Sequence, residues 1–344
     1  MEINKNREYG DTNGKMKPKK ICIISFAKDD ADVIESFIRY HLTFIDSIVI
    51  IDDRSTDATP EIVRSLSLEG LPVELIQVPK DSPVTTIDFV QSIIKSQYMK
   101  AFDDNFCWVL PLNLDEFLYC EDGRNPRSEL EKLDERVEYR FFWRTGVYSR
   151  EPDDSNVFLP NYFEEYRDPS LERFTKVILS RHLAKDKGAI FAHGFHLILF
   201  PDEKKRAGVP VIHHTLLRVA HFPVRSINHV MTKVIFGQLW IFAFASTNYN
   251  PFHWEKIYNT IKSEGVPTTE QVRRFSLEYA LTEDQLDVPL DTIKQFRGAL
   301  RADFLINDIG LSYTNYDNNN YLGPILNYFE LLLDNLKAGD SKQM

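Results

Sequence analysis

The chain has 344 residues, of which 43% are hydrophobic and 27% charged, so it is long enough to bury a full core. Its formal net charge of -10 argues against non-specific binding to nucleic acid, which depends on cationic patches that neutralise phosphates. No apolar run approaches the roughly 20 residues that span a bilayer, and the polar N-terminus lacks the apolar stretch of a signal peptide. We therefore expect a cytoplasmic protein without a transmembrane segment. The three cysteines are an odd number at wide spacings, which predicts neither a disulfide framework nor a zinc site.

The N-terminal third alternates short apolar runs with amphipathic segments. Residues 1–18 are polar and offer little to bury, so we expect a flexible leader there. Thr59 followed by Pro60 is typical of a helix start. The alternation predicts an α/β fold with a mostly parallel central sheet flanked by helices. The predicted strands are 21–26, 48–51, 73–78 and 108–112, and the predicted helices are 32–42, the segment from Thr59, and 88–101.

The rest of the chain follows a different pattern. After Phe117 the sequence is rich in aromatic strand-like runs, including 140–143 and 174–179. From Ser226 onward the pattern is mainly helical. We expect one main domain over 19–240 and a helical C-terminal extension over 241–344 that packs on it. The apolar segment 321–336 is open to a homodimer contact or a membrane-surface contact, and its acids disfavour the membrane.

Acidic residues follow the predicted strands. Ligands of open α/β sheets bind outside the carboxyl ends of the strands, so these loops should line the site. Asp115 and Glu116, with the amide of Asn113 just before them, are well placed to hold a hard cation. The chain lacks both the glycine-rich turn of a dinucleotide-binding fold and a P-loop. The polar residues of the other loops are Lys28, Asp29 and Asp30 after the first strand, and Asp52, Asp53, Arg54, Ser55 and Asp57 after the second.

Three stretches carry a resemblance to the family 2 glycosyltransferases. The stretch from Ile50 to Thr59 is similar to their DD-x-S-x-D-x-T motif. The stretch from Leu112 to Phe117 resembles their D-x-D motif, although Asn113 stands where the first acid is expected. The stretch from His221 to Ser226, followed by Lys233 and Gly237, resembles the H-[YF]-x-x-[KR]-S…K…G signature of a family 2-like subgroup with a D-x-DEF motif.

This resemblance covers residues 20–237 and has clear implications. It implies the nucleotide-diphospho-sugar transferase (GT-A) fold, a UDP- or GDP-type nucleotide-sugar donor, and Mn²⁺ or Mg²⁺. It also implies a hexosyltransferase-type enzyme of polysaccharide biosynthesis, acting on a surface polysaccharide or lipopolysaccharide acceptor. The metal would stabilise the leaving diphosphate as a Lewis acid while an acceptor hydroxyl attacks from the opposite face, so the anomeric carbon would be inverted.

The resemblance also implies roles for individual residues. Asp52 and Asp53 would contact the base or ribose of the donor, with Asn113 reaching ribose or a metal-bound water. Asp115 would ligate the metal and serve the catalytic step, and His221 would present its ring to metal or pyrophosphate. The basic residues that would hold the diphosphate oxygens are Arg225 and Lys233, with Lys176 as a further candidate.

The general base is left open among several residues. It must be a carboxylate or imidazole within hydrogen-bond reach of the acceptor hydroxyl. Residue His196 lies where the subgroup shows a G-x-H element, which marks it as a site residue without establishing it as the base. The candidates are Asp153, Asp154, His193 and His196.

Other interpretations remain for the same residues. Asp57 and Thr59 are also typical of a turn that caps the next helix, and Asp115 with Glu116 could form a solvated turn. A sugar nucleotidyltransferase would need a glycine-rich first loop, which residues 26–30 lack. A non-catalytic nucleotide-sugar-binding relative is the main alternative, because Asn113 removes one negative charge from the motif.

Overall fold

The structure is a computed structural model, and it describes residues 18–79, 87–151, 158–244, 252–282, 285–286, 288–295 and 311–314. The predicted leader, apart from Pro18, and the apolar segment 321–336 lie outside these ranges. The base candidates Asp153 and Asp154 also lie outside them.

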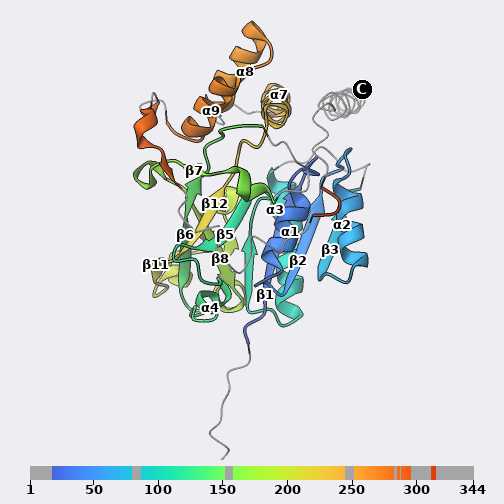
Figure 1. The fold of residues 1–344 in the computed structure, drawn as a ribbon. Helices are drawn as coiled ribbons and strands as arrows, with labels where there is room; N and C mark the ends of the chain where they lie inside the picture. The colour runs from blue at the N-terminus through green and yellow to red at the C-terminus, as the bar shows by residue number, and fades with distance from the viewer. Residues whose placement is uncertain are drawn as a thin grey trace, which may run out of the picture.

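The N-terminal part is a βαβαβαβ unit, as predicted (Figure 1). Its strands pair in parallel in the order β3-β2-β1-β4. The strands are nearly continuous apolar runs because helices cover both faces of the sheet. The α/β prediction is therefore confirmed. The bounds are β1 Ile21–Ala27, α1 Ile34–His41, β2 Ser47–Asp52, α2 Thr59–Leu68, β3 Val73–Gln77, α3 Ile87–Asp103 and β4 Trp108–Pro111.

The sheet continues into a mixed half with antiparallel pairs. Beyond β4 the order is β8-β6-β12-β5, and β11 also pairs with β6. Although β5 directly follows β4 in sequence, it pairs antiparallel with β12, which places Glu116 opposite His221. This pairing brings two distant segments to one end of the sheet. The bounds are β5 Glu116–Cys120, β6 Glu138–Thr145, β8 Thr175–Ser180, β11 Val211–His213 and β12 Leu217–His221.

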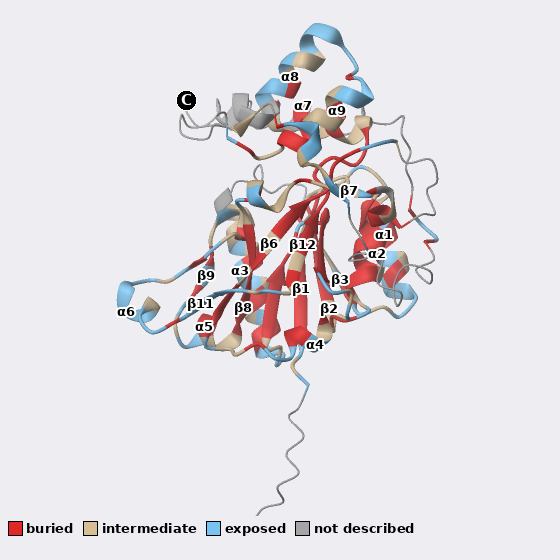
Figure 2. Cartoon of the chain, turned by 60° about the vertical axis from the view of Figure 1, so that its left-hand side comes forward, coloured by how far each residue is buried: buried red, intermediate tan, exposed pale blue. Residues whose placement is uncertain are grey.

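Most of the short helices, strands and 3-10 turns connect strands of the mixed half of the sheet, and longer helices follow it in sequence. The region after Ser226 is mainly helical where it is described, as predicted, and these helices lie beyond one end of the sheet (Figures 1 and 2). No helix in the described ranges is both long and apolar enough to cross a membrane. The short elements are α4 Arg127–Leu130, β7 Glu165–Tyr166, α5 Arg181–Lys185, β9 Ile190–Phe191, β10 Ile198–Leu199, α6 Glu203–Arg206 and β13 Lys294–Gln295, with 3-10 turns at 159–162, 169–171, 193–195 and 290–292. The later helices are α7 Ile227–Phe244, α8 Phe252–Glu264 and α9 Thr269–Glu278.

The core lies on both faces of the sheet. Alternate residues of β1 point to opposite faces, so Ile21 and Ile23 join one apolar cluster while Cys22 and Ile24 join another. Helices α1 and α2 complete the first cluster, and α3 packs into the second. The strands of the sheet are largely red in Figure 2, because most of their residues are buried. All three cysteines are free thiols, and Cys22 and Cys120 are buried.

A buried glutamate ties helix α1 to the segment 311–314. Glu35 is fully buried, and its carboxylate accepts hydrogen bonds from the backbone N–H groups of Ser312, Tyr313 and Thr314 at 2.8, 2.7 and 2.7 Å. The guanidinium of Arg39 donates to the same carboxylate at 2.9 Å. Burial acts to raise the pKa of Glu35, but these hydrogen bonds outweigh it and lower the pKa. The described part of the C-terminal segment is thereby fixed to the first helix.

Candidate functional site

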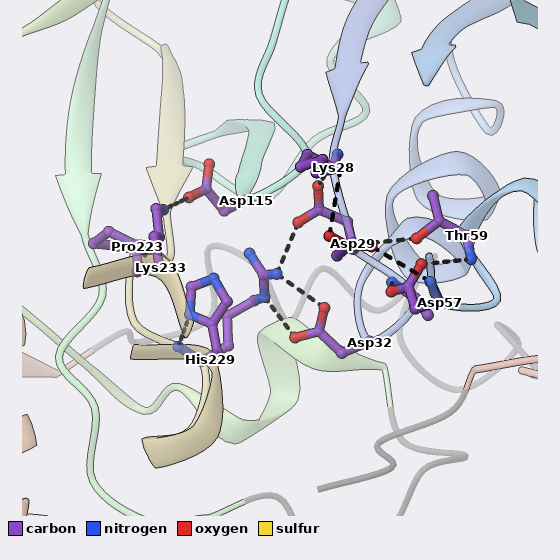
Figure 3. Close-up of polar contacts among 12 residues, drawn as sticks. Lys28, Asp29, Asp32, Asp57, Thr59, Asp115, Pro223, His229 and Lys233 are labelled. Atoms are coloured by element: carbon purple, nitrogen blue, oxygen red, sulfur yellow. Dashed lines mark hydrogen bonds and ion pairs between the residues drawn. The ribbon is translucent and has the colours of Figure 1, made fainter. Parts of the chain in front are cut away.

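The loops after β1 and β2 are joined by aspartates that accept backbone hydrogen bonds. The carboxylate of Asp57 accepts from the N–H groups of Ala31 and Thr59, each at 2.9 Å (Figure 3). The carboxylate of Asp29 accepts from the N–H of Thr56 at 2.6 Å. Both oxygens of Asp57 are thus used within the loops, and the interpretation of Asp57 as a turn-shaping residue is confirmed. These contacts hold the two loops in one arrangement.

Two residues of the same loops have a strained backbone conformation. Asp29 and Arg54 have φ angles of 53° and 58°, in the left-handed region that non-glycine residues rarely adopt. The ammonium of Lys28 donates to the carbonyls of Asp53 and Arg54 at 3.0 and 2.9 Å, which holds this conformation. Strained residues persist only where neighbouring contacts determine them, and they cluster at functional sites.

The two predicted nucleoside ligands have different environments. Asp53 is partly exposed, and its carboxylate pairs with Arg54 at 3.0 Å. Asp52 is fully buried at the end of β2, and burial raises the pKa of its carboxyl group. Asp53 therefore presents its side chain closer to solvent, whereas Asp52 lies beneath it in the sheet.

A second group forms where the β4–β5 turn meets the end of β12. Asp115 and His221 are 5% and 2% exposed, and Nε2 of His221 lies 3.7 Å from Oδ2 of Asp115. The ammonium of Lys233, from helix α7, is 3.1 Å from the same oxygen (Figure 3). The indole of Trp143 stacks on His221 with a centroid distance of 4.0 Å. The resemblance-based candidates Asp115, His221 and Lys233 are therefore in contact.

This group contains buried polar atoms that have no partner among the described residues. They include Oδ1 of Asp115 and Nδ1 of His221. Burial lowers the pKa of His221 to about 3, so its ring is neutral near pH 7, the form that binds metals. Burial acts to raise the pKa of Asp115, but Lys233, His221 and Arg225 together outweigh it and hold the pKa well below its usual range. A carboxylate and a neutral imidazole suit Mn²⁺, so the residues present fit a divalent cation.

Glu116 is the third residue near which a metal ion could be held, but its carboxylate already forms an ion pair with Lys176. Single ligand atoms of Asp115, Glu116 and His221 lie within 4.8 Å of one another. Glu116, however, contacts the ammonium of Lys176 at 3.0 Å, and both side chains are fully buried. Burial raises the pKa of Glu116 to about 7, against the opposing charge of Lys176. The N–H of Asn113 also donates to Glu116, at 2.8 Å, while the Asn113 residue is exposed.

Lys176 and Arg225 were both candidates for the diphosphate, and both have internal partners. Lys176 also donates to the carbonyl of Gly194 at 2.9 Å. Arg225 is 2% exposed and pairs with Asp30 at 2.8 Å and with Asp32 at 2.6 Å. Because Asp30 and Asp32 follow β1, Arg225 connects the acidic loops to the segment after β12. Burial raises the pKa of Asp30 to about 6, despite the charge of Arg225.

Two of the base candidates fall within the described residues. His193 is exposed. Nδ1 of His196 donates to the carbonyl of Thr175 at 2.8 Å, which leaves Nε2 as the acceptor. A Cβ added to Gly194 would lie only 2.9 Å from that Nε2, so the nitrogen faces the Gly194 backbone. Burial lowers the pKa of His196 to about 4.

The C-terminal helices contribute a residue that the sequence did not indicate. Tyr279 follows α9, its ring centroid is 5.5 Å from that of His221, and the ammonium of Lys233 lies 5.9 Å above the ring. Arg167, which is buried, donates to the carbonyl of Tyr279 at 2.6 Å and pairs with Glu172 at 2.7 Å. No local motif marks Tyr279, because its position depends on how α9 packs.

Comparisons with known proteins give weak structural similarities. No protein-family model matches the sequence, and no curated protein matches it either. Staphylococcus aureus TarS 1-349 in complex with UDP is similar at TM-score 0.32 and 15% identity, over 79% of this chain and 76% of that one. The mannosyltransferase PcManGT from Pyrobaculum calidifontis, in complex with GDP-Man and Mn²⁺, is similar at TM-score 0.35 and 15% identity, over 75% and 76%.

A third similar structure is GalNAc-T7 with UDP, GalNAc and Mn²⁺, at TM-score 0.34 and 10% identity. This match covers 79% of the present chain but only 55% of GalNAc-T7. Similarities of this strength do not identify a substrate or a reaction. What stands on the structure itself is an α/β fold with a mixed, mostly parallel central sheet and a polar site at one end of it.

Proposed function

We propose that this chain is an inverting glycosyltransferase that moves a sugar from a nucleoside-diphosphate sugar to a hydroxyl of a glycan acceptor. The observation that carries this proposal is the contact of Asp115, His221 and Lys233 beside the acidic loops after β1 and β2. These loops follow the carboxyl ends of parallel strands, where open α/β sheets bind their ligands. The motif resemblance supports the same chemistry from an independent direction.

Asp115 and His221 are the residues we propose for the metal. Their unpartnered buried atoms, Oδ1 and Nδ1, favour a ligand at this position, because buried polar atoms without partners are costly. A bound Mn²⁺ or Mg²⁺ would supply Lewis-acid stabilisation of the departing diphosphate. Glu116, paired with Lys176, serves this site by fixing the turn that carries Asp115.

For the donor, we propose that the exposed side of the acidic loops binds the nucleoside. Of the three predicted nucleoside ligands, Asp53 is partly exposed and Asn113 is exposed, whereas Asp52 is buried beneath them. Lys233, at 30% side-chain exposure, is the basic group best placed for the diphosphate of a UDP- or GDP-type donor. Through its buried ion pair with Asp32, Arg225 fixes the loop after β1, and through its buried pair with Glu116, Lys176 fixes the β4–β5 turn.

The acceptor side requires a general base. The best base has a pKa near the working pH, so His196, with a pKa of about 4 and its Nε2 against Gly194, suits a positioning role. From the remaining candidates Asp153, Asp154 and His193 we propose the carboxylate of Asp154 as the base, with the substitution D154N as its direct test. A glycan of the surface polysaccharide or lipopolysaccharide type is the acceptor class implied by the motif resemblance.

The test is a thermal-shift screen of UDP, GDP, CDP and TDP, each with and without Mn²⁺. A ligand present at 100 times its Kd stabilises the native state by about 2.7 kcal/mol, so specific binding is easily seen. We expect a metal-dependent shift for one nucleotide, release of that nucleotide from its sugar conjugate, and an inverted anomeric product by NMR. Nucleotide binding without turnover would favour the non-catalytic relative. No shift and no turnover with any donor would overturn the proposal.

A further inference from the structure

The oxygen of Asp115 that faces His221 is already bound by a cation of the protein. Nζ of Lys233 is 3.1 Å from Oδ2 of Asp115, and Nε2 of His221 is 3.7 Å from the same atom. A divalent ion held by Asp115 and His221 would lie beside this carboxylate whichever oxygen it used, so it would come within a few ångströms of the ammonium. A divalent cation and an ammonium only a few ångströms apart repel each other, so both cannot remain there at low cost.

Lys233 has contacts that it would retain on leaving Asp115. Its ammonium is 3.5 Å from the carbonyl of Pro223 and 5.9 Å from the ring centroid of Tyr279. Its side chain is 30% exposed. Lys176 differs in each respect, because it is fully buried and held between Glu116 and Gly194. Of these two lysines, Lys233 is therefore the one able to move without leaving a buried charge unpaired.

We propose that Lys233 is an internal counter-ion of Asp115 that competes with the divalent cation and, when displaced, becomes available to the diphosphate of the donor. Metal alone then binds weakly, because it must displace the ammonium. A nucleotide offers the displaced ammonium a new anionic partner, so metal and nucleotide bind cooperatively. The second half of this inference rests on the proposed function, whereas the competition involves only this chain and a metal ion.

The experiment measures Mn²⁺ binding to the full chain without nucleotide, by the electron paramagnetic resonance signal of free Mn²⁺. The variants are K233M and K233Q, and D115N marks the loss of the site. The matched control is K256M, because Lys256 lies on the exposed surface of α8 and pairs with Glu278 at 2.7 Å. It loses the same formal charge without touching Asp115. Urea unfolding of each variant establishes that it is folded.

We expect K233M and K233Q to bind Mn²⁺ about tenfold more tightly than the wild type, which corresponds to a typical coupling between two sites. K256M should bind like the wild type. An affinity in both Lys233 variants equal to or below that of K256M would overturn the competition. In a second arm, adding the stabilising nucleotide should tighten Mn²⁺ binding more in the wild type than in K233M, and equal tightening would overturn the coupling. A failure of the proposed function is detected in a different measurement, as the absence of nucleotide release from any sugar donor.

Discussion

The two halves of the site use the same residue type in opposite ways. In the loops after β1 and β2, Asp57 accepts backbone hydrogen bonds with both oxygens, from Ala31 and from Thr59. In the β4–β5 turn, Asp115 keeps one buried oxygen without a partner among the described residues, beside an imidazole nitrogen of His221 in the same condition. A carboxylate satisfied by its own backbone maintains the fold. A buried carboxylate with one oxygen that accepts no hydrogen bond can bind a ligand that is not part of the chain, such as a metal ion.

The largest expected effect comes from removing the buried ion pair of Lys176 with Glu116, the residue that follows Asp115. K176M leaves Glu116 as an unpaired buried charge, so we expect a loss of about 3–5 kcal/mol in the free energy of unfolding, measured with urea. K185M is the control, because the pair of Lys185 with Asp103 is largely exposed and should contribute under about 1 kcal/mol. If K176M is too unstable to purify, E116Q/K176M should restore part of the stability. Equal stability of K176M and K185M would contradict the assignment.

A substitution of Asp115 should affect function far more than folding. We expect D115N to lower the rate of sugar transfer by about 100-fold or more, because it removes the charge that would hold the metal against the leaving group. Its urea midpoint should fall only modestly, because Asn has nearly the same size as Asp and the partner that loses its ion pair, Lys233, is 30% exposed. The measurement is the initial rate of nucleotide release under saturating donor. A D115N enzyme with near wild-type turnover would show that the charge of Asp115 is not needed.

The complementary change is D57A, which should affect folding more than function. It leaves the N–H groups of Ala31 and Thr59 without their acceptor, so we expect a loss of about 2 kcal/mol in the free energy of unfolding. Mn²⁺ affinity should change less than in D115N. The control is D122A, since Asp122 is an exposed turn aspartate and should matter little. A larger loss of Mn²⁺ affinity than of stability in D57A would reverse the comparison.

The smallest expected effect concerns a buried histidine outside the site. Nδ1 of His41 donates to the carbonyl of Phe37, and Nε2 accepts from the N–H of Leu118, so its neutral ring is fully satisfied, unlike that of His221. Burial lowers the pKa of His41 from 6.5 to about 3. Since the unfolded chain binds the proton first, this stability is complete above pH 6.5 and is lost as the pH falls toward 3.

Between pH 7.5 and 5.5 the loss from His41 amounts to about 1.4 kcal/mol in the free energy of unfolding. The measurement compares urea unfolding of the wild type and H41Q at both pH values. The other buried histidines contribute equally to both proteins, so the difference in pH dependence isolates His41. Parallel pH dependences in the two proteins would contradict the assignment.

The sequence predicted the N-terminal fold well because its signals are local. The apolar run from Ile21 and the Thr59-Pro60 helix start lie within single elements, and both are confirmed. The pairing of β5 with β12 could not be predicted in this way. It joins Glu116 to His221, which lie about a hundred residues apart, and no periodic pattern records a partner at that distance.

The candidate site was predicted by residue type but not by partner. Asp57 and Asp115 both follow strands, so nothing in the sequence separates the satisfied carboxylate from the half-satisfied one. Lys176 was considered a diphosphate ligand because a lysine in an apolar strand is unusual, and only the tertiary structure places Glu116 against it. Tyr279 was missed because an aromatic residue at the end of a helix has many uses.

The attachment of Glu35 to residues 312–314 has a consequence for synthesis of the protein. Glu35 emerges from the ribosome 277 residues before Ser312, an interval of roughly 15 to 55 s at bacterial and eukaryotic translation rates. Throughout that interval its carboxylate has only Arg39 and water as partners, so the N-terminal end of α1 cannot reach its final buried state. Helix α1 is therefore synthesised early but reaches its final packing late. A nascent chain that stops before residue 312 lacks the backbone N–H groups that bind Glu35 in the complete protein.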